Sequence, residues 1–199
     1  TRTWPGANAV ATVDPSGSFG GDLSGLIYVP AAGVTAAHMY AAENGNGLLY
    51  RLQQTAGVWA PVTTQGYTNG KTLRYPGGAG VPDAESVTMA DFGDPSVYVS
   101  AERRDGGASR NSILLYDVSS SATSLTAQLE WNLTSILPST GSNAGAEAVT
   151  FVPDAFLVAS GFYDERTSAP YTPATYGDHG GGLFFVGLEA TGGIYAVAL

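Results

Sequence analysis

The chain has 199 residues, a formal net charge of −9 and only eight lysines and arginines, a balance that disfavours binding to the phosphate backbone of nucleic acids. It has no cysteine, which excludes disulfides, thiolate metal sites and cysteine nucleophiles, and no run of about 18 apolar residues, so we expect no membrane span. Its 27 glycines, 11 prolines and 11 tyrosines favour short strands separated by turns.

The first residues, Thr-Arg-Thr-Trp-Pro, include neither an initiator methionine nor the pattern of a signal peptide. We therefore expect a processed or trimmed end. Together with the acidic, cysteine-free and lysine-poor composition, this favours a secreted bacterial protein, extracellular or periplasmic.

Residues 7–13 are a short apolar run, and we expect one separate strand there. After it, three segments resemble one another: residues 22–29, 83–90 and 145–152. The third positions of these segments, Ser24, Glu85 and Glu147, are 61 and 62 residues apart. Such self-similarity at a nearly fixed period indicates a repeat architecture.

Three more strands are expected after each of these segments. The second strands are residues 39–43, 98–102 and 157–161; the third are 47–52, 112–118 and 182–188; the fourth are 58–62, 127–131 and 194–199. No segment shows helical apolar spacing over the length that a helix needs. The pattern therefore predicts twelve strands in three sets of four.

The predicted fold class is all-β, and the predicted architecture is a β-propeller in a single domain of residues 1–199. Its three four-stranded antiparallel blades are expected at about residues 21–63, 83–133 and 145–199. A β-sandwich, which also has many short strands, is the alternative. Because propellers have about four to eight blades, we expect half of a six-bladed ring, closed by further chain or by a second copy, with residues 7–13 as a ring-closing strand.

Several motifs in these repeats resemble secreted bacterial propellers of the phytase-like group, which includes the "esterase-like activity of phytase" family. The resemblance rests on Asp-Leu-Ser-Gly at 22–25, on residues 43–52, on Asp-Ala-Glu-Ser-Val-Thr at 83–88, on residues 100–103 and 110–117, and on Ala-Glu-Ala-Val-Thr at 146–150. It implies an acidic channel that holds calcium, and an enzyme that uses this channel to hydrolyse phosphomonoesters.

Four glutamates are expected to share one rim of the propeller, because the start of a first strand and the end of a second strand meet there. They are Glu43, Glu85, Glu102 and Glu147, and His38 is expected at the opposite rim. One interpretation makes these carboxylates ligands of Ca²⁺, which takes six to eight oxygens. The other makes each an acceptor for backbone N–H groups of the neighbouring blade.

Residues 162–181 form a long, aromatic-rich connection that we expect to cover the axial opening at the same rim. Asp164 is a candidate metal ligand, and Asp178 with His179 is either an acid/base pair or a surface ion pair. Arg103 and Arg110, in the turn before the third strand of the second blade, either hold an anionic ligand or pair with nearby carboxylates.

Two functions remain open on this basis. The first is a Ca²⁺-dependent secreted hydrolase of phosphoesters or other esters, with Arg103 and Arg110 neutralising the anion that leaves. The second is a non-catalytic propeller whose Tyr163, Tyr171 and Tyr176 contact a polysaccharide or a protein partner. A small anionic or carbohydrate ligand is compatible with either.

Overall fold

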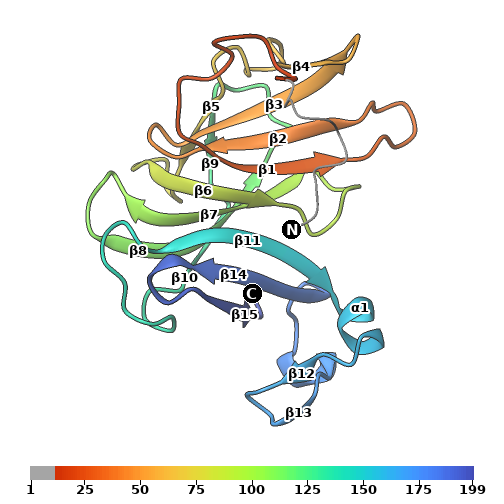
Figure 1. The fold of residues 1–199 in the computed structure, drawn as a ribbon, viewed down its shortest axis with the longest axis vertical. Coiled ribbons are helices and arrows are strands. Elements are labelled where there is room, and N and C mark those ends of the chain that lie inside the picture. Colours follow the sequence, from red (N-terminus) through yellow and green to blue (C-terminus); the bar gives the residue numbers. More distant parts are fainter. Residues whose placement is uncertain (1–11) are drawn as a thin grey trace, which may run out of the picture.

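The computed structural model describes residues 12–199, and these fold into an all-β arrangement of several antiparallel sheets (Figure 1). Three sheets follow one another along the chain and account for most of the structure. The all-β class predicted from the sequence is confirmed. Residues 12–199 close no barrel and no ring of sheets.

The first sheet runs in the order β1-β2-β3-β5-β9, and β4 also pairs with β3. Its strands are β1 (Leu23–Val29), β2 (His38–Glu43), β3 (Leu48–Thr55), β4 (Val58–Pro61), β5 (Lys71–Arg74) and β9 (Ser124–Thr126). Strands β5 and β9 were not expected from the sequence. They pair in parallel, although β9 comes from the middle of the second sheet's segment.

The second sheet is the antiparallel meander that the repeat predicts, in the order β10-β8-β7-β6. Its strands are β6 (Pro82–Thr88), β7 (Ser96–Arg104), β8 (Ser109–Asp117) and β10 (Leu129–Asn132). Successive residues of β8 face opposite sides, as a strand's period of two requires. Leu114 and Tyr116 enter the core shared with the first sheet, whereas Ile113 enters the core shared with the third.

The third sheet departs from the prediction, because residues 157–161 are not its second strand. They belong largely to helix α1 (Asp154–Ala159), which follows Pro153 in an extended conformation and carries Asp154 in its first turn. The sheet therefore has the order β11-β14-β15, and its strands are β11 (Ala146–Pro153), β14 (Gly182–Leu188) and β15 (Gly193–Val197).

The chain between β11 and β14 folds into a small separate lobe, residues 154–181. It contains α1, the two-stranded sheet of β12 (Tyr163–Asp164) and β13 (Ala169–Pro170), and the 3-10 helix η1 (Pro173–Tyr176); a second 3-10 helix, η2 (Glu189–Thr191), precedes β15. Leu157 and Tyr171 pack with Leu183 of β14 in a hydrophobic cluster that joins the lobe to the third sheet.

The first strands of the three sheets, β1, β6 and β11, lie next to one another and point the same way (Figure 1). The backbones of β1 and β6 approach so closely that a Cβ atom at Gly25 would lie 2.6 Å from the Cα atom of Ser86. Only glycine fits that crossing without a shift of the backbone. The parallel first strands bring the beginnings of β1, β6 and β11 to one end of the molecule.

The separate strand expected at 7–13 lies outside the described residues apart from its last two, of which Val13 accepts a hydrogen bond from Trp59. Among the described residues, no helix has the length and apolar character needed to cross a membrane.

Candidate functional site: an acidic pocket

The expected glutamates do gather at one end of the molecule, where β1, β6 and β11 begin. Glu43 pairs with Leu23 at the start of β1, and Asn44 beside it donates a hydrogen bond to Glu85 of β6 at 3.3 Å. Glu147 lies at the start of β11. His38 pairs with Val29 at the far end of β1, so the prediction of opposite ends is correct.

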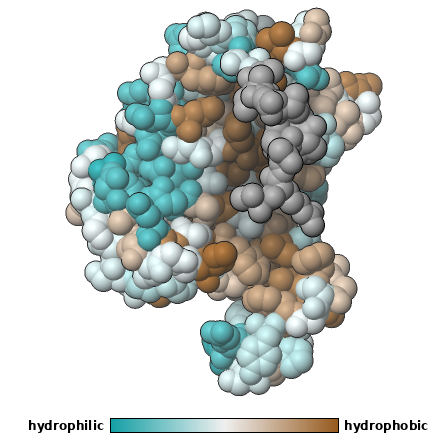
Figure 2. All heavy atoms as spheres, in the orientation of Figure 1, coloured by the Kyte–Doolittle hydropathy of each residue, from teal (hydrophilic) through white to brown (hydrophobic). Residues whose placement is uncertain are grey.

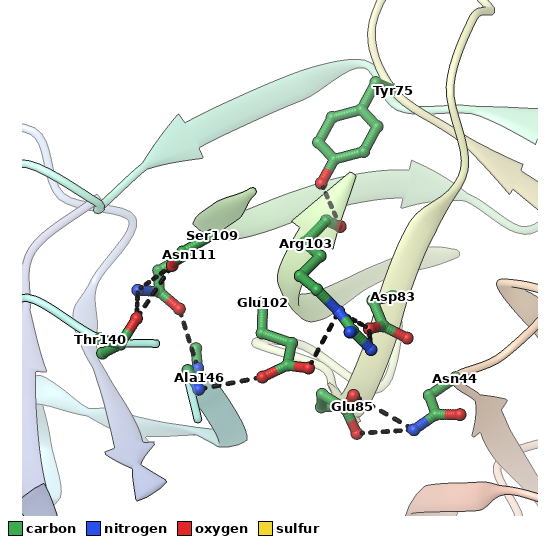
Figure 3. A network of polar contacts seen from close by, with 11 residues as sticks. Asn44, Tyr75, Asp83, Glu85, Glu102, Arg103, Ser109, Asn111, Thr140 and Ala146 are labelled. Carbon is green, nitrogen blue, oxygen red and sulfur yellow. Dashed lines mark hydrogen bonds and ion pairs between the residues drawn. The ribbon is translucent and has the colours of Figure 1, made fainter. Parts of the chain in front are cut away.

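Three carboxylates form the centre of this end: Asp83, Glu85 and Glu102. One oxygen from each lies within 4.8 Å of the others, and the three residues are only 7%, 5% and 2% exposed (Figure 3). Asp83 was not singled out from the sequence, although it stands two residues before Glu85. The pairing of β6 with β7 is irregular on both sides of Ala84, and such bulges re-aim neighbouring side chains. We call these three residues the acidic pocket.

Arg103 at the end of β7 is the counter-ion of the pocket (Figure 3). Its guanidinium forms an ion pair with Asp83, and its Nε atom lies 3.3 Å from Oε1 of Glu102. The hydroxyl of Tyr75 donates a hydrogen bond to the backbone carbonyl of Arg103 at 3.0 Å. Within residues 12–199, one positive charge therefore faces three acidic side chains, so the pocket has an excess of acidic groups.

Three carboxyl groups of this end, those of Glu85, Glu102 and Glu147, resist ionisation. Burial, followed by repulsion from Asp83 and Glu102, raises the pKa of Glu85. Burial also raises the pKa of Glu102, against the opposing effects of the Gly145 N–H and Arg103. Burial and the neighbouring carboxylates, Glu85 first, raise the pKa of Glu147 to about 7. A bound cation would relieve both the repulsion and the cost of burial.

Two of the four glutamates also serve the structure. Oε2 of Glu102 accepts a hydrogen bond from the backbone N–H of Gly145 at 2.9 Å, in the segment that leads into the third sheet. Glu43 accepts from Asn46 at 2.7 Å and from the hydroxyl of Tyr50 at 2.9 Å, both within its own sheet. The carboxylate of Glu43 thus has its hydrogen-bond donors outside the acidic pocket. Glu102 belongs both to the pocket and to the junction between the second and third sheets.

An open cleft of about 640 Å³ leads to the pocket between the turns of the first two sheets. It is lined by Asp22, Asn44, Gly45, Asn46, Val81, Pro82, Asp83, Arg103, Asp105 and Gly106. Hydrophilic residues gather over this end of the first two sheets, on the left of Figure 2. Asp83 of the pocket and its counter-ion Arg103 reach the wall of the cleft.

The lobe residues proposed from the sequence lie elsewhere, because the lobe leaves from the end of β11 and not from its beginning (Figure 1). The expectation that residues 162–181 cover the acidic end is therefore wrong. Asp164 accepts hydrogen bonds from the hydroxyl of Tyr176 and from the N–H of Arg166, and the bond from Tyr176 lowers the pKa of its carboxyl group.

His179 does not pair with Asp178, which is exposed. Its Nε2 atom lies 3.1 Å from both carboxylate oxygens of Asp154 and 3.1 Å from the hydroxyl of Tyr171. Its Nδ1 atom bonds the carbonyl of Gly177, and this contact raises the pKa of His179 against the effect of burial. The group fixes α1 to the rest of the lobe.

Arg110 pairs with Glu130 and not with the carboxylates of the acidic pocket. Its Nε and Nη2 atoms each donate to a carboxylate oxygen of Glu130 at 2.8 Å, and its guanidinium lies 5.5 Å from the ring centre of Tyr75. This paired geometry corresponds to the second of the two interpretations made for the arginines. Of these two arginines, only Arg103 lines the cleft.

Comparison of the chain with models of protein families, with curated proteins and with solved structures found no match in any of the three.

Proposed function

We propose that the three sheets are consecutive blades of a β-propeller, and that the acidic pocket is a calcium site of a secreted, phytase-like hydrolase. The blade proposal is supported by the side-by-side first strands β1, β6 and β11 and by the meander order of the second sheet. The ring would be completed by further chain or by a second copy. Its location would be extracellular or periplasmic.

The observation that carries the proposal is the spacing of the pocket oxygens. Ca²⁺ binds carboxylate oxygens at about 2.3–2.6 Å, so two of its ligands can be at most about 5 Å apart. The oxygens of Asp83, Glu85 and Glu102 lie within 4.8 Å of one another. Three hard oxygen donors at this spacing fit Ca²⁺ in both chemistry and size, and water and the cleft would complete the coordination.

Asp83, Glu85 and Glu102 would hold the ion, and a bound Ca²⁺ would supply a Lewis acid that polarises a phosphoryl or acyl oxygen of the substrate. Arg103 faces the cleft and would pair with an anionic group of the substrate. Glu147 is half-buried beside the pocket, and we assign it to proton transfer because of that position. Burial of the pocket strengthens each of these charge interactions.

The alternative, a non-catalytic propeller that binds ligands through tyrosines of the lobe, has less support. Tyr171 is buried and donates to Asp154, and Tyr176 stacks on Tyr171 and donates to Asp164. Only Tyr163, 55% exposed, remains open to a partner. The lobe thus uses most of its aromatic residues for its own packing.

Isothermal titration with CaCl₂ tests the calcium site directly. The wild-type protein should bind Ca²⁺, and Glu85→Gln should weaken binding at least tenfold. Within residues 12–199 Glu85 forms no ion pair, and glutamine can still accept the hydrogen bond from Asn44, so this change should spare the fold. Glu165→Gln, an exposed change in the lobe, is the matched control. Hydrolysis of p-nitrophenyl phosphate and of p-nitrophenyl acetate, with Ca²⁺ and with a chelator, then tests activity. Absence of Ca²⁺ binding would overturn the site, and Ca²⁺ binding without hydrolysis would overturn the enzyme.

A further inference from the structure

A second cleft lies beside the acidic pocket and has a different chemistry. Its volume is about 630 Å³, and it opens between the start of β8 and the connection from β10 to β11. Six hydroxyl side chains line it: Ser109, Thr134, Ser135, Ser139, Thr140 and Ser142. We call it the hydroxyl cleft. It shares no lining residue with the cleft that leads to the acidic pocket.

Asn111 forms the buried base of the hydroxyl cleft and is only 1% exposed. Its Oδ1 atom accepts from the N–H of Ala146 at 3.0 Å, and its Nδ2 atom donates to the hydroxyl of Thr140 at 3.3 Å (Figure 3). Thr140 is in turn 2.9 Å from the hydroxyl of Ser109. This chain of contacts fixes one wall of the cleft before any ligand arrives.

The remaining hydroxyls are free to meet a ligand. Within residues 12–199, the side chains of Thr134, Ser135, Ser139 and Ser142 form no hydrogen bond to another residue. A hydroxyl both donates and accepts, and short side chains lose little entropy when they are held. The cleft therefore offers several adaptable partners at small entropic cost.

The lining also determines which ligands are disfavoured. It contains no lysine or arginine, and the chain carries a net charge of −9, so an anion would be repelled. It contains no carboxylate, so a cation would go to the acidic pocket instead. Ala108 and Leu137 are the only lining residues with apolar side chains, and a purely apolar ligand would leave the six hydroxyls without partners.

We propose that the hydroxyl cleft is a binding site for a neutral sugar. The hydroxyls of a monosaccharide match the paired donors and acceptors of the cleft, and its lack of charge matches the lining. Because the lining has no aromatic ring on which a sugar face could stack, the dissociation constant should be in the millimolar range. This site goes beyond the proposed calcium chemistry and does not depend on it.

Titration of ¹⁵N-labelled protein with glucose, in the presence of a chelator, tests the site by NMR. Amide shifts should saturate and should cluster in residues 134–142. Glucuronate and glucosamine, the anionic and cationic counterparts, should bind this cleft more weakly than glucose. Shifts without saturation, shifts confined to other segments, or tighter binding of glucuronate would overturn the proposal. Failure of Ca²⁺ binding would leave it standing, because the chelator removes the metal from the assay.

Variants locate the site. Ser135→Ala combined with Ser139→Ala removes two exposed hydroxyls and should weaken glucose binding about fivefold or more, since each lost hydrogen bond has a modest effect. Thr140→Val keeps the shape of the side chain and should weaken binding similarly. Thr63→Val, at the outer edge of the first sheet, is the matched control and should bind as the wild type does. If Thr140→Val unfolds, the double variant Ser135→Ala, Ser139→Ala tests the site alone. Unchanged affinity for glucose in this double variant would exclude the cleft as the binding site.

Discussion

The carboxylate of Glu102 accepts a hydrogen bond from the backbone N–H of Gly145 at 2.9 Å, across the junction between the second and third sheets. The approach is close: a Cβ atom at residue 145 would lie 2.6 Å from the Cβ atom of Glu102. A residue of the acidic pocket therefore also sets where β11 begins. Geometry of the pocket and packing of the third sheet are coupled through this contact.

Replacing Glu102 should destabilise the protein more than replacing Glu85. Glu102→Ala leaves the buried N–H of Gly145 without an acceptor, and such an unpaired group costs about 1–3 kcal/mol. Glu102→Gln keeps an oxygen acceptor and should recover much of that loss. Urea denaturation of the wild type, Glu102→Ala, Glu102→Gln and Glu85→Gln measures these differences in unfolding free energy. Equal stability of the alanine and glutamine variants would contradict the role of the Gly145 contact.

Calcium should raise the melting temperature if it binds only the native state. At about 100 times the dissociation constant, the gain in unfolding free energy is about 2.7 kcal/mol, which for a chain of this size is a rise of roughly 5–10 °C. Mg²⁺ should give a smaller rise, because it demands shorter distances and octahedral geometry. Differential scanning calorimetry with each ion, and with Glu85→Gln, makes the measurement.

Stability without metal should fall as pH rises through the range in which Glu147 titrates. Its pKa is raised from the ordinary value to about 7, so between about pH 4.5 and 7 the native state binds more protons than the unfolded state. This contribution is fully present below the unfolded pKa and is lost as pH rises through the folded pKa. Glu147→Gln should flatten the profile of urea midpoints against pH. An unchanged profile would contradict the raised pKa.

Lys71, the only lysine of the chain, should be protected from amine reagents in the native state. It is fully buried, and its Nζ atom donates to the carbonyls of Gln65, Ser120 and Ala122 at 2.6–2.7 Å. It therefore ties the first sheet to the turn before β9. Acetylation followed by mass spectrometry should modify Lys71 only in urea, and Lys71→Met should lower the unfolding free energy by about 2–4 kcal/mol.

The sequence predicted strands β1–β4 of the first sheet, the four strands of the second sheet and the shared end of the glutamates, because alternating apolar residues and turn signals are local features. It did not predict β5 or β9. It did not carry the burial of Lys71, which depends on carbonyls about fifty residues away. It also could not separate α1 from a strand, since the apolar run at 155–159 is too short for a helical period to appear. Asp154, an acidic residue in the first turn, was the available signal for a helix start.

Helix α1 follows β11 directly, so the lobe lies at the opposite end of β11 from the acidic pocket and should be dispensable for Ca²⁺ binding. Pro153 and Gly182 are register partners on β11 and β14, and the N–H of Asp154 donates to the carbonyl of Gly181 at 3.0 Å. Residues 154–181 can therefore be replaced by Asn-Gly, the two-residue connection that suits an antiparallel hairpin.

The shortened protein should fold with somewhat lower stability, since Leu183 loses its contacts with Leu157 and Tyr171. Its affinity for Ca²⁺ should stay within about twofold of the wild type, because sites that share no partners act independently. Circular dichroism checks the fold and isothermal titration checks the binding. A folded variant that no longer binds Ca²⁺ would show that the lobe, and not the end formed by β1, β6 and β11, holds the metal.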